Sequence, residues 1–383
     1  MQPDGTGPGP VRRVLMTTDT VGGVWHYAME LAAALSARGV EVALAAMGGP
    51  PSPEARAAAA AVPGLRLFES DHRLEWMDDP WDDVARAGAW LFDLEAQLSP
   101  QIVHVNGYCH AALPFRAPAL LVAHSCVLSW WRAVLGEPAP ARYDRYRAEV
   151  ARGLRAASIV VAPTAAMLRC LEEYGVRTEG RARVIPNARD GQRFRPADTD
   201  KEAFVFAAGR LWDEAKNLAA LAEAAPRLPW PVVVAGSDAH PGGGRRPAPP
   251  PVRALGLLSE HELSQWMARA AVYAAPARYE PFGLSILEAG LSGCALVLGD
   301  IPSLREVWGD AALFVDPDDT GALAAAIQRL AGDPALREEL GERARRRALR
   351  HRPRVMAHAY LAAYGEALAA RPAAEPAEEA ICA

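Results

Sequence analysis

The stretch "AVYAAPARYEPFGLSILEAG" occupies residues 271–290. It opens with an apolar run typical of a buried strand and continues into a loop that contains two prolines. Pro281 suits the entrance of a helix, and Gly283 removes a Cβ where a ligand could approach the backbone. The stretch therefore predicts a strand, a loop and a helix that begins near Phe282. A strand followed directly by a helix is the repeating unit of a parallel α/β sheet.

The same alternation of apolar runs and amphipathic segments extends along almost the whole chain. Runs such as "VRRVLMTTD", "QIVHVNG" and "ASIVVAPT" each precede a helix-length segment. We expect an α/β fold with two Rossmann-like, doubly wound domains that face a central cleft. The predicted boundaries are a disordered tail at 1–10, an N-terminal domain at 11–186, a linker at 187–200, a C-terminal domain at 201–350, a helix at 351–370 and a disordered tail at 371–383.

The bulk composition argues against several classes of function. The 383 residues have a formal net charge of -5, which gives no overall basic field for nucleic acid. The five cysteines include no CxxC pair, so they fit neither a zinc pattern nor a disulfide framework. No apolar run approaches the length of a membrane-spanning helix, and the first residues do not read as a signal peptide. We expect a cytoplasmic protein.

Two predicted strand-to-helix loops carry residues suited to an anion. Gly22 and Gly23 follow the first strand, where glycines let the backbone approach an anion and the next helix offers free N–H groups. The pattern differs from GxGxxG, so a nicotinamide fingerprint is a poor match. In "AAGRLWDEAKN", Arg210 and Lys216 follow the first strand of the second domain and can neutralise a diphosphate without a metal. A plain tight turn and two solvated cations are the alternatives.

Glu280 and Glu288 are eight positions apart around the predicted helix start. Glu288 would lie about two turns along the helix, among apolar or small residues. An ionised carboxylate there needs a hydrogen-bonding partner, and ligand hydroxyls are suitable ones. A core Glu paired with an Arg or with backbone N–H groups elsewhere in the chain is the alternative. Spacing alone does not decide between them.

As a set, these motifs resemble those of the retaining glycosyltransferases of family 4, which adopt the GT-B architecture. In the second domain the resemblance rests on "AAGRLWDEAKN", "LGLLSEHEL", "APARYEPFGLSILEAGLSGCALVLGD" and "REVWGDAALFVDPDD". In the first domain the glycine loop, "IVHVNG", "VAHS" and "VIPN" match more weakly. The resemblance implies that the C-terminal helix crosses back to the first domain.

The resemblance also implies a site for a nucleoside-diphosphate sugar, with no metal and no further cofactor. Arg210 and Lys216 would bind the diphosphate, Glu280 the hydroxyls of the transferred sugar, and Glu288 the ribose. Together with His124, a strand-end histidine that would reach the sugar, the first three form the implied catalytic set. Further donor contacts are implied for the glycine loop, the backbone of the helix start and the loop beside the base: Gly22, Gly23, Phe282, Gly283, Leu284, Gly256, Leu257 and Leu258.

The chain departs from the family pattern at two places. Asn187-Ala188 stands where the family has Asn-Gly, which leaves the geometry of that loop open. A Gly/Pro-rich insertion, "HPGGGRRPAPPP" at residues 240–251, lies near the base site and leaves the base specificity open.

The candidates for the acceptor side come from the residues themselves. Asp19 ends the first predicted strand. Trp25 follows the glycine loop, and Trp130 and Trp131 follow His124. Aromatic faces suit a sugar or a cyclitol. A turn-stabilising Asp is an equal alternative, and core packing is favoured for most of the tryptophans. His104, also at the end of an apolar run, is interpreted as a hydrogen-bonded core residue.

The predicted function is retaining transfer of a hexose from a nucleoside-diphosphate sugar, with a UDP-glucose-like donor favoured, to a hydroxyl acceptor. A small soluble metabolite or a glycan is the expected acceptor. A sugar-nucleotide epimerase or phosphorylase on the same scaffold, and a two-lobed sugar-binding protein without catalysis, are the alternatives. The basic segments "ARYDRYRAEVARGLR" and "ERARRRALRHRPR" make peripheral membrane contact a less favoured alternative.

Overall fold

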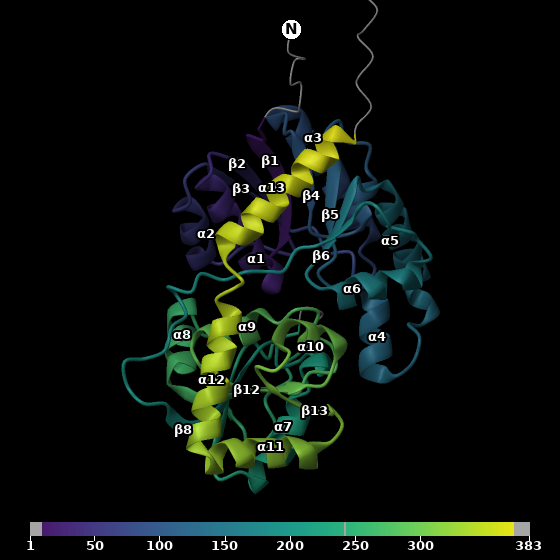
Figure 1. Cartoon of the computed structure of the whole chain (residues 1–383). Helices are drawn as coiled ribbons and strands as arrows, with labels where there is room; N and C mark the ends of the chain where they lie inside the picture. Colours follow the sequence, from purple (N-terminus) through teal and green to yellow (C-terminus); the bar gives the residue numbers. More distant parts are fainter. Residues whose placement is uncertain (1–9, 241–242, 371–383) are drawn as a thin grey trace, which may run out of the picture.

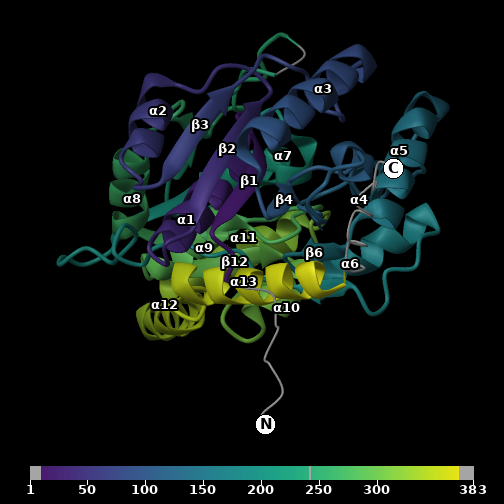
Figure 2. The same ribbon diagram turned by 90° about the horizontal axis from the view of Figure 1, so that it is seen from above.

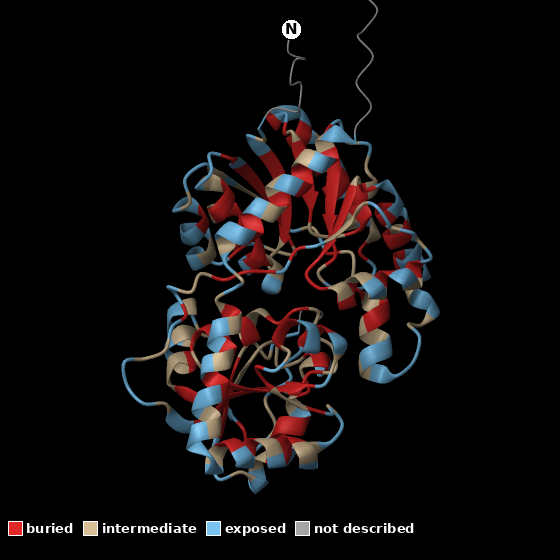
Figure 3. Ribbon diagram, in the orientation of Figure 1, coloured by how far each residue is buried: buried red, intermediate tan, exposed pale blue. Residues whose placement is uncertain are grey.

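The computed structural model describes residues 10–240 and 243–370, which form two lobes placed one above the other (Figure 1). The disordered tails predicted at 1–10 and 371–383 lie, except for Pro10, outside the described residues. Buried residues run through the middle of each lobe, and exposed residues lie on the outer helix faces (Figure 3). Each lobe therefore has a core of its own.

The first lobe is built on a seven-stranded parallel sheet in the order β3-β2-β1-β4-β5-β6-β7. Its strands are β1 (Arg13–Asp19), β2 (Glu41–Met47), β3 (Leu65–Glu69), β4 (Ile102–Val105), β5 (Ala119–Val122), β6 (Ile159–Ala162) and β7 (Ala182–Val184). Its α-helices are α1 (Gly23–Ser36), α2 (Pro53–Ala60), α3 (Trp81–Leu98), α4 (Val127–Leu135), α5 (Asp144–Ala156) and α6 (Ala165–Cys170), with short 3-10 helices at Cys109–Ala112, Ala141–Tyr143 and Leu171–Tyr174.

Alternate residues of β1 point to opposite faces of this sheet. Val14 and Met16 pack toward α1, whereas Leu15 packs toward α3. Viewed from above, α3 and α1 lie on opposite sides of the strands (Figure 2). Since both faces are covered, the strands can be apolar throughout, and every residue of β6 is buried.

The second lobe is built on a six-stranded parallel sheet in the order β10-β9-β8-β11-β12-β13. Its strands are β8 (Glu202–Ala208), β9 (Val232–Ala235), β10 (Arg253–Ala254), β11 (Ala270–Ala275), β12 (Ala295–Gly299) and β13 (Leu313–Val315). Its α-helices are α7 (Leu218–Ala224), α8 (Glu260–Arg269), α9 (Leu284–Leu291), α10 (Pro302–Trp308), α11 (Thr320–Gly332) and α12 (Pro334–Ala348), with 3-10 helices at Glu214–Lys216 and Ala225–Arg227.

The helix predicted to begin near Phe282 begins at Leu284 instead. Gly283 has a φ of 89°, a left-handed conformation in which the backbone turns from the loop into α9. The pattern of Pro, Phe and Gly located the helix entrance but could not show which residue takes the positive φ.

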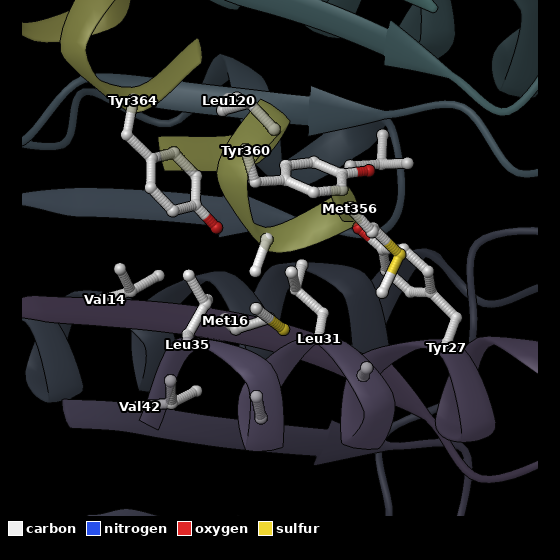
Figure 4. Close-up of a cluster of buried hydrophobic side chains, with 14 of the residues drawn as sticks. Val14, Met16, Tyr27, Leu31, Leu35, Val42, Leu120, Met356, Tyr360 and Tyr364 are labelled. Carbon is white, nitrogen blue, oxygen red and sulfur yellow. The ribbon is translucent and has the colours of Figure 1, made fainter. Parts of the chain in front are cut away.

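The last helix, α13 (Pro353–Ala369), returns to the first lobe, as the resemblance implied. Figure 1 shows it lying across that lobe, and Figure 4 shows Met356, Tyr360 and Tyr364 facing Leu31 and Leu35 of α1. These side chains are buried in one cluster with β1 and β2. The C-terminal end of the chain is therefore part of the first domain's core.

Tyr364 also makes a buried polar contact, and this supplies a test of the crossover. Its hydroxyl lies 2.7 Å from Nδ1 of His104 in β4. We expect Tyr364→Phe to cost about 1–3 kcal/mol of unfolding free energy, because it leaves that nitrogen buried without a partner. Tyr364→Ala should cost about 3–5 kcal/mol because it also opens a cavity. Chemical denaturation measures both, and Val355→Ala on the exposed side of α13 should change stability by less than about 0.5 kcal/mol. Equal effects at residues 355 and 364 would contradict the docking.

Candidate active site

The candidate site lies where the carboxyl ends of the two sheets meet. In each sheet the strand order reverses beside the first strand of the lobe, between β1 and β4 and between β8 and β11. Open α/β sheets bind ligands at such reversal points. Asp19 ends β1 and Asn106 follows β4 in the first lobe, while Arg210 and Glu280 follow β8 and β11 in the second.

The glycine loop of the first lobe lies directly against the second lobe. Oδ1 of Asp19 accepts hydrogen bonds of 3.0 Å from the backbone N–H groups of Val21 and Gly22, which fixes the turn. A Cβ on Gly22 would lie 3.1 Å from Nη1 of Arg210, and one on Gly23 would lie 3.4 Å from the side chain of Leu284. Asp19 thus has the turn-stabilising role that the sequence left open, and the glycines permit the close approach.

The two predicted diphosphate ligands line one pocket together with Glu280. Nζ of Lys216 lies 2.5 Å from Oε2 of Glu280, and Nη2 of Arg210 lies 2.6 Å from Oδ2 of Asp213. Burial alone would raise the pKa of Asp213, but Arg210 and Lys216 hold it below its usual value, so the carboxylate is ionised at neutral pH. Each cation of the pocket is therefore paired with an acid. Asp213 is a site residue that the sequence reasoning missed.

At the helix start between Glu280 and Glu288, the groups available to a ligand are backbone groups rather than side chains. Phe282 is buried in the core of the second lobe, and the carbonyl oxygen of Pro281 accepts a hydrogen bond from Thr164 of the first lobe at 3.0 Å. Gly283 precedes the first turn of α9, which has no side-chain cap. Free N–H groups of this turn are available to an anion.

Glu288 does not line the pocket of Arg210 and Lys216. It is 5% exposed, and its Oε1 lies 2.7 Å from Nε of Arg189 in the linker. Burial raises the pKa of Glu288 to about 7, although Arg189 opposes that rise. In the structure Glu288 therefore has the arginine partner that the sequence left as the alternative, and its contact with a ribose stays a prediction.

The two strand-end histidines share one amide. Oδ1 of Asn106 lies 3.2 Å from Nε2 of His104 and 2.9 Å from Nε2 of His124, while its Nδ2 donates to the carbonyl oxygen of Thr17. Because Oδ1 can only accept, both Nε2 atoms carry a proton. Burial lowers the pKa of each ring to about 3, so both are neutral and Nδ1 is an acceptor.

These contacts separate the two histidines. His104 is fully buried, and its Nδ1 accepts a hydrogen bond from the hydroxyl of Tyr364 in α13. It therefore belongs to the core. His124 is only partly buried and remains a candidate for the sugar. Asn106 was missed as an individual residue, although its position directly after the "IVHV" strand was the available signal.

The tryptophans predicted on the acceptor side have other contacts. Trp25 is 8% exposed and belongs to the core cluster of the first lobe, which is the core-packing alternative. Nε1 of Trp130 lies 3.2 Å from Oδ1 of Asp213 across the boundary between the lobes. Trp131 packs against Tyr143 and Arg142. None of these contacts tests an acceptor role, which stays a prediction.

The loop expected beside the base contributes no lining residue to the pocket of Arg210 and Lys216, so its contact with a base stays a prediction. Gly256 has a φ of 75°, and its carbonyl oxygen accepts a hydrogen bond of 2.8 Å from Gly236. Leu257 is 80% exposed, whereas Leu258 packs against the core. Within the described ranges, no group of three or more His, Cys, Asp or Glu side chains is placed to hold a metal ion, and no helix has the length and apolarity to cross a membrane.

Two family comparisons match consecutive parts of the chain. Residues 21–193 match the family described as "Glycosyltransferase Family 4", and residues 202–333 match "Glycosyl transferases group 1". Among curated proteins, the chain is 40% identical over 87 residues to O-antigen chain mannosyltransferase B of Escherichia coli, an alignment that covers 23% of each chain. The chain thus spans about a quarter of the length of the curated relatives that it matches.

Solved structures are similar to the whole fold. Sucrose-phosphate synthase from Thermosynechococcus elongatus has a TM-score of 0.78 at 20% identity, over 94% of this chain and 100% of that chain. The Anabaena protein Alr3699/HepE in complex with UDP-glucose has a TM-score of 0.72 at 17% identity, over 91% of this chain and 98% of that chain. Two facing Rossmann-like domains with a crossover helix define the GT-B architecture. The chain belongs to the glycosyltransferases of the family 4 type.

The left-handed turn before α9 supplies a test of the site's geometry. Gly283→Ala places a Cβ at a φ of 89° and 2.7 Å from Cδ1 of Ile286. We expect a loss of about 1–2 kcal/mol in stability and weaker binding of a nucleoside diphosphate, with UDP as the probe, because the start of α9 must shift. Chemical denaturation and calorimetry measure the two effects.

Gly365→Ala is the matched control, because a Cβ there meets nothing within 4 Å inside α13. It should stabilise the protein by up to about 1 kcal/mol and leave UDP binding unchanged. Unchanged UDP binding in both variants would show that the turn does not shape the site.

Proposed function

We propose that the protein transfers a hexose from a nucleoside-diphosphate sugar to a hydroxyl acceptor with retention of configuration. The observation that carries the proposal is the convergence of Arg210, Lys216, the start of α9 and the glycine loop at one boundary. Cations, free N–H groups and a helix N-terminus are the groups that bind a diphosphate. The sugar hydroxyls would face Glu280.

In the proposed reaction the bond between the sugar's anomeric carbon and the diphosphate oxygen breaks, and a bond to the acceptor oxygen forms. Negative charge develops on the leaving diphosphate, where Arg210 and Lys216 stabilise it. The acceptor attacks from the side of the leaving group, and its proton passes to a phosphate oxygen. Glu280 acts as a positioning carboxylate rather than as a nucleophile, because its oxygen is engaged by Lys216.

His124 has a supporting role in this proposal. Its Nε2–H is held by Asn106, which fixes the ring and leaves Nδ1 as an acceptor. A neutral imidazole in that orientation can accept a hydrogen bond from a sugar hydroxyl without adding charge.

We favour a UDP-glucose-like donor and a small soluble metabolite or a glycan as the acceptor. Support for the donor comes from the fold shared with a protein solved in complex with UDP-glucose. A similarity to a mannosyltransferase makes other donors the competing outcome. An epimerase would return a nucleotide sugar, a phosphorylase would need phosphate, and a non-catalytic module would leave the donor intact. Release of UDP that depends on an added hydroxyl acceptor separates the proposal from all three.

The base is tested by calorimetric titration with UDP, GDP, ADP and dTDP. We expect UDP to bind at least about 10-fold more tightly than the others, which corresponds to about 1.4 kcal/mol. Tightest binding of GDP would keep the glycosyltransferase proposal and change its donor. A lack of binding by all four would overturn the proposed donor site.

The role of Lys216 is tested by Lys216→Ala. We expect turnover of UDP-glucose to fall by about 100-fold or more, since one charge-stabilising donor is lost at the leaving group. The midpoint of thermal unfolding should change little, because Lys216 is partly exposed. Arg245→Ala, which removes an exposed cation of the same lobe, is the control and should leave turnover unchanged. Parallel losses of turnover and stability in Lys216→Ala would contradict the assigned role.

A further inference from the structure

Arg189, in the linker between the lobes, is surrounded by three carboxylates. Its side chain is 2% exposed. Nη1 lies 3.1 Å from Glu30, Nη2 lies 2.6 Å from Glu260, and Nε lies 2.7 Å from Glu288. The two Nη contacts are hydrogen bonds, whereas the Nε contact is an ion pair outside hydrogen-bonding geometry. Each nitrogen of the guanidinium thus has a different acidic partner.

The three acids come from helices of both lobes. Glu30 belongs to α1 of the first lobe, while Glu260 and Glu288 belong to α8 and α9 of the second. The backbone N–H of Arg189 also donates to the carbonyl oxygen of His351, which lies between α12 and α13. Both connections of the chain between the lobes therefore meet at this residue.

The helices that Arg189 joins are those that begin at the candidate donor site. α1 starts at Gly23 and α9 at Leu284, which face each other across the boundary. At about 1.5 Å per residue, Glu30 lies about 10 Å behind the start of α1, and Glu288 about 6 Å behind the start of α9. A single side chain behind the site therefore fixes how far apart the two helix starts stand.

The charges of the cluster make Arg189 difficult to replace. Glu30 and Glu288 are both buried, and burial raises the pKa of each. Without the guanidinium, the buried carboxyls of Glu30 and Glu288 on opposite lobes would face one another, with Arg193 and His26 as further basic side chains at the cluster. Arg193 reaches Glu30 and Glu260 at 3.4 and 3.3 Å, but it is 47% exposed and has no described contact with Glu288. Carboxylates that stay charged there would repel each other, and carboxyls that become protonated would lose the ionic contact that joins the lobes, so either outcome loosens the boundary.

We propose that Arg189 is a positioning residue that holds the two lobes closed over the donor by joining Glu30 of α1 to Glu288 of α9. This inference rests on the proposed function, since it assigns to one linker residue the alignment of the glycine loop with the start of α9. The donor's affinity depends on that alignment, because its diphosphate contacts both lobes. The chemistry at Arg210, Lys216 and Glu280 does not involve Arg189 directly.

The test uses Arg189→Gln in the full chain, with UDP and UDP-glucose as probes. We expect the Kd for UDP and the KM for UDP-glucose to rise at least about 10-fold, with kcat changed less than about 3-fold. Small-angle scattering should show a larger radius of gyration without UDP, and saturating UDP should restore the wild-type value. Arg193→Gln removes a cation from the same cluster and is the control. It should change the Kd for UDP, the KM for UDP-glucose and kcat by less than about 2-fold each.

A double-mutant cycle shows whether Arg189 acts through its partners. If it does, Arg189→Gln combined with Glu288→Gln should weaken UDP binding by much less than the product of the single effects. Arg189→Lys keeps the charge but cannot contact all three carboxylates as the guanidinium does. Its affinity for UDP should therefore lie between those of Arg189→Gln and the wild type. It also serves as the measurable variant if Arg189→Gln does not fold.

The outcomes separate this inference from the proposed function. Wild-type protein that binds no UDP overturns the proposed donor, while scattering by the variants still tests the closure. Wild-type protein that binds UDP, together with Arg189→Gln that binds it equally and scatters identically, overturns the inference alone. A loss of kcat and stability with an unchanged KM would also overturn it, because it would show a structural role only.

Discussion

Every pairing between the named strands β1 to β13 is parallel, and this constraint determines where chemistry can occur. Parallel strands place all of their strand-to-helix loops on one edge of a sheet. In this protein those edges of the two sheets face each other. The glycine loop after β1 and the loops after β8 and β11 therefore meet although they are far apart in sequence. No single loop forms the site, and the relative placement of the lobes becomes the property on which binding depends.

Several polar contacts cross the boundary between the lobes. The hydroxyl of Tyr279 accepts hydrogen bonds from Cys126 and Ser129 at the start of α4, and Glu306 accepts from the first N–H groups of α6. Such contacts are directional and contribute less to affinity than a buried apolar surface of the same size. They can align two lobes without joining them permanently. The buried apolar side chains of α13, by contrast, attach the end of the chain firmly to the first lobe.

Sequence patterns predicted the parts of this protein that depend on local periodicity. Apolar runs and Gly/Pro signals located most of the strands, the two lobes and the loops that carry Arg210, Lys216 and Glu280, but not β3 or β7. The helix start was misplaced by two residues, since a pattern does not show which residue adopts a positive φ. The partner of Glu288 could not be predicted, because Arg189 lies 99 positions earlier in a segment without periodicity. That pairing arises only when the linker folds back against α9.

Ion pairs within the pocket explain how two cations can lie close together without destabilising the protein. Arg210 is paired with Asp213 and Lys216 with Glu280, so each charge has a partner of opposite sign before the donor arrives. A diphosphate would compete for both cations, and Glu280 would exchange the ammonium of Lys216 for sugar hydroxyls. Because Asp213 also caps the short helix that carries Lys216 and accepts from Trp130 of the first lobe, the cations keep their positions during that exchange. The site is therefore organised before binding, and the binding free energy need not be spent on ordering its charges.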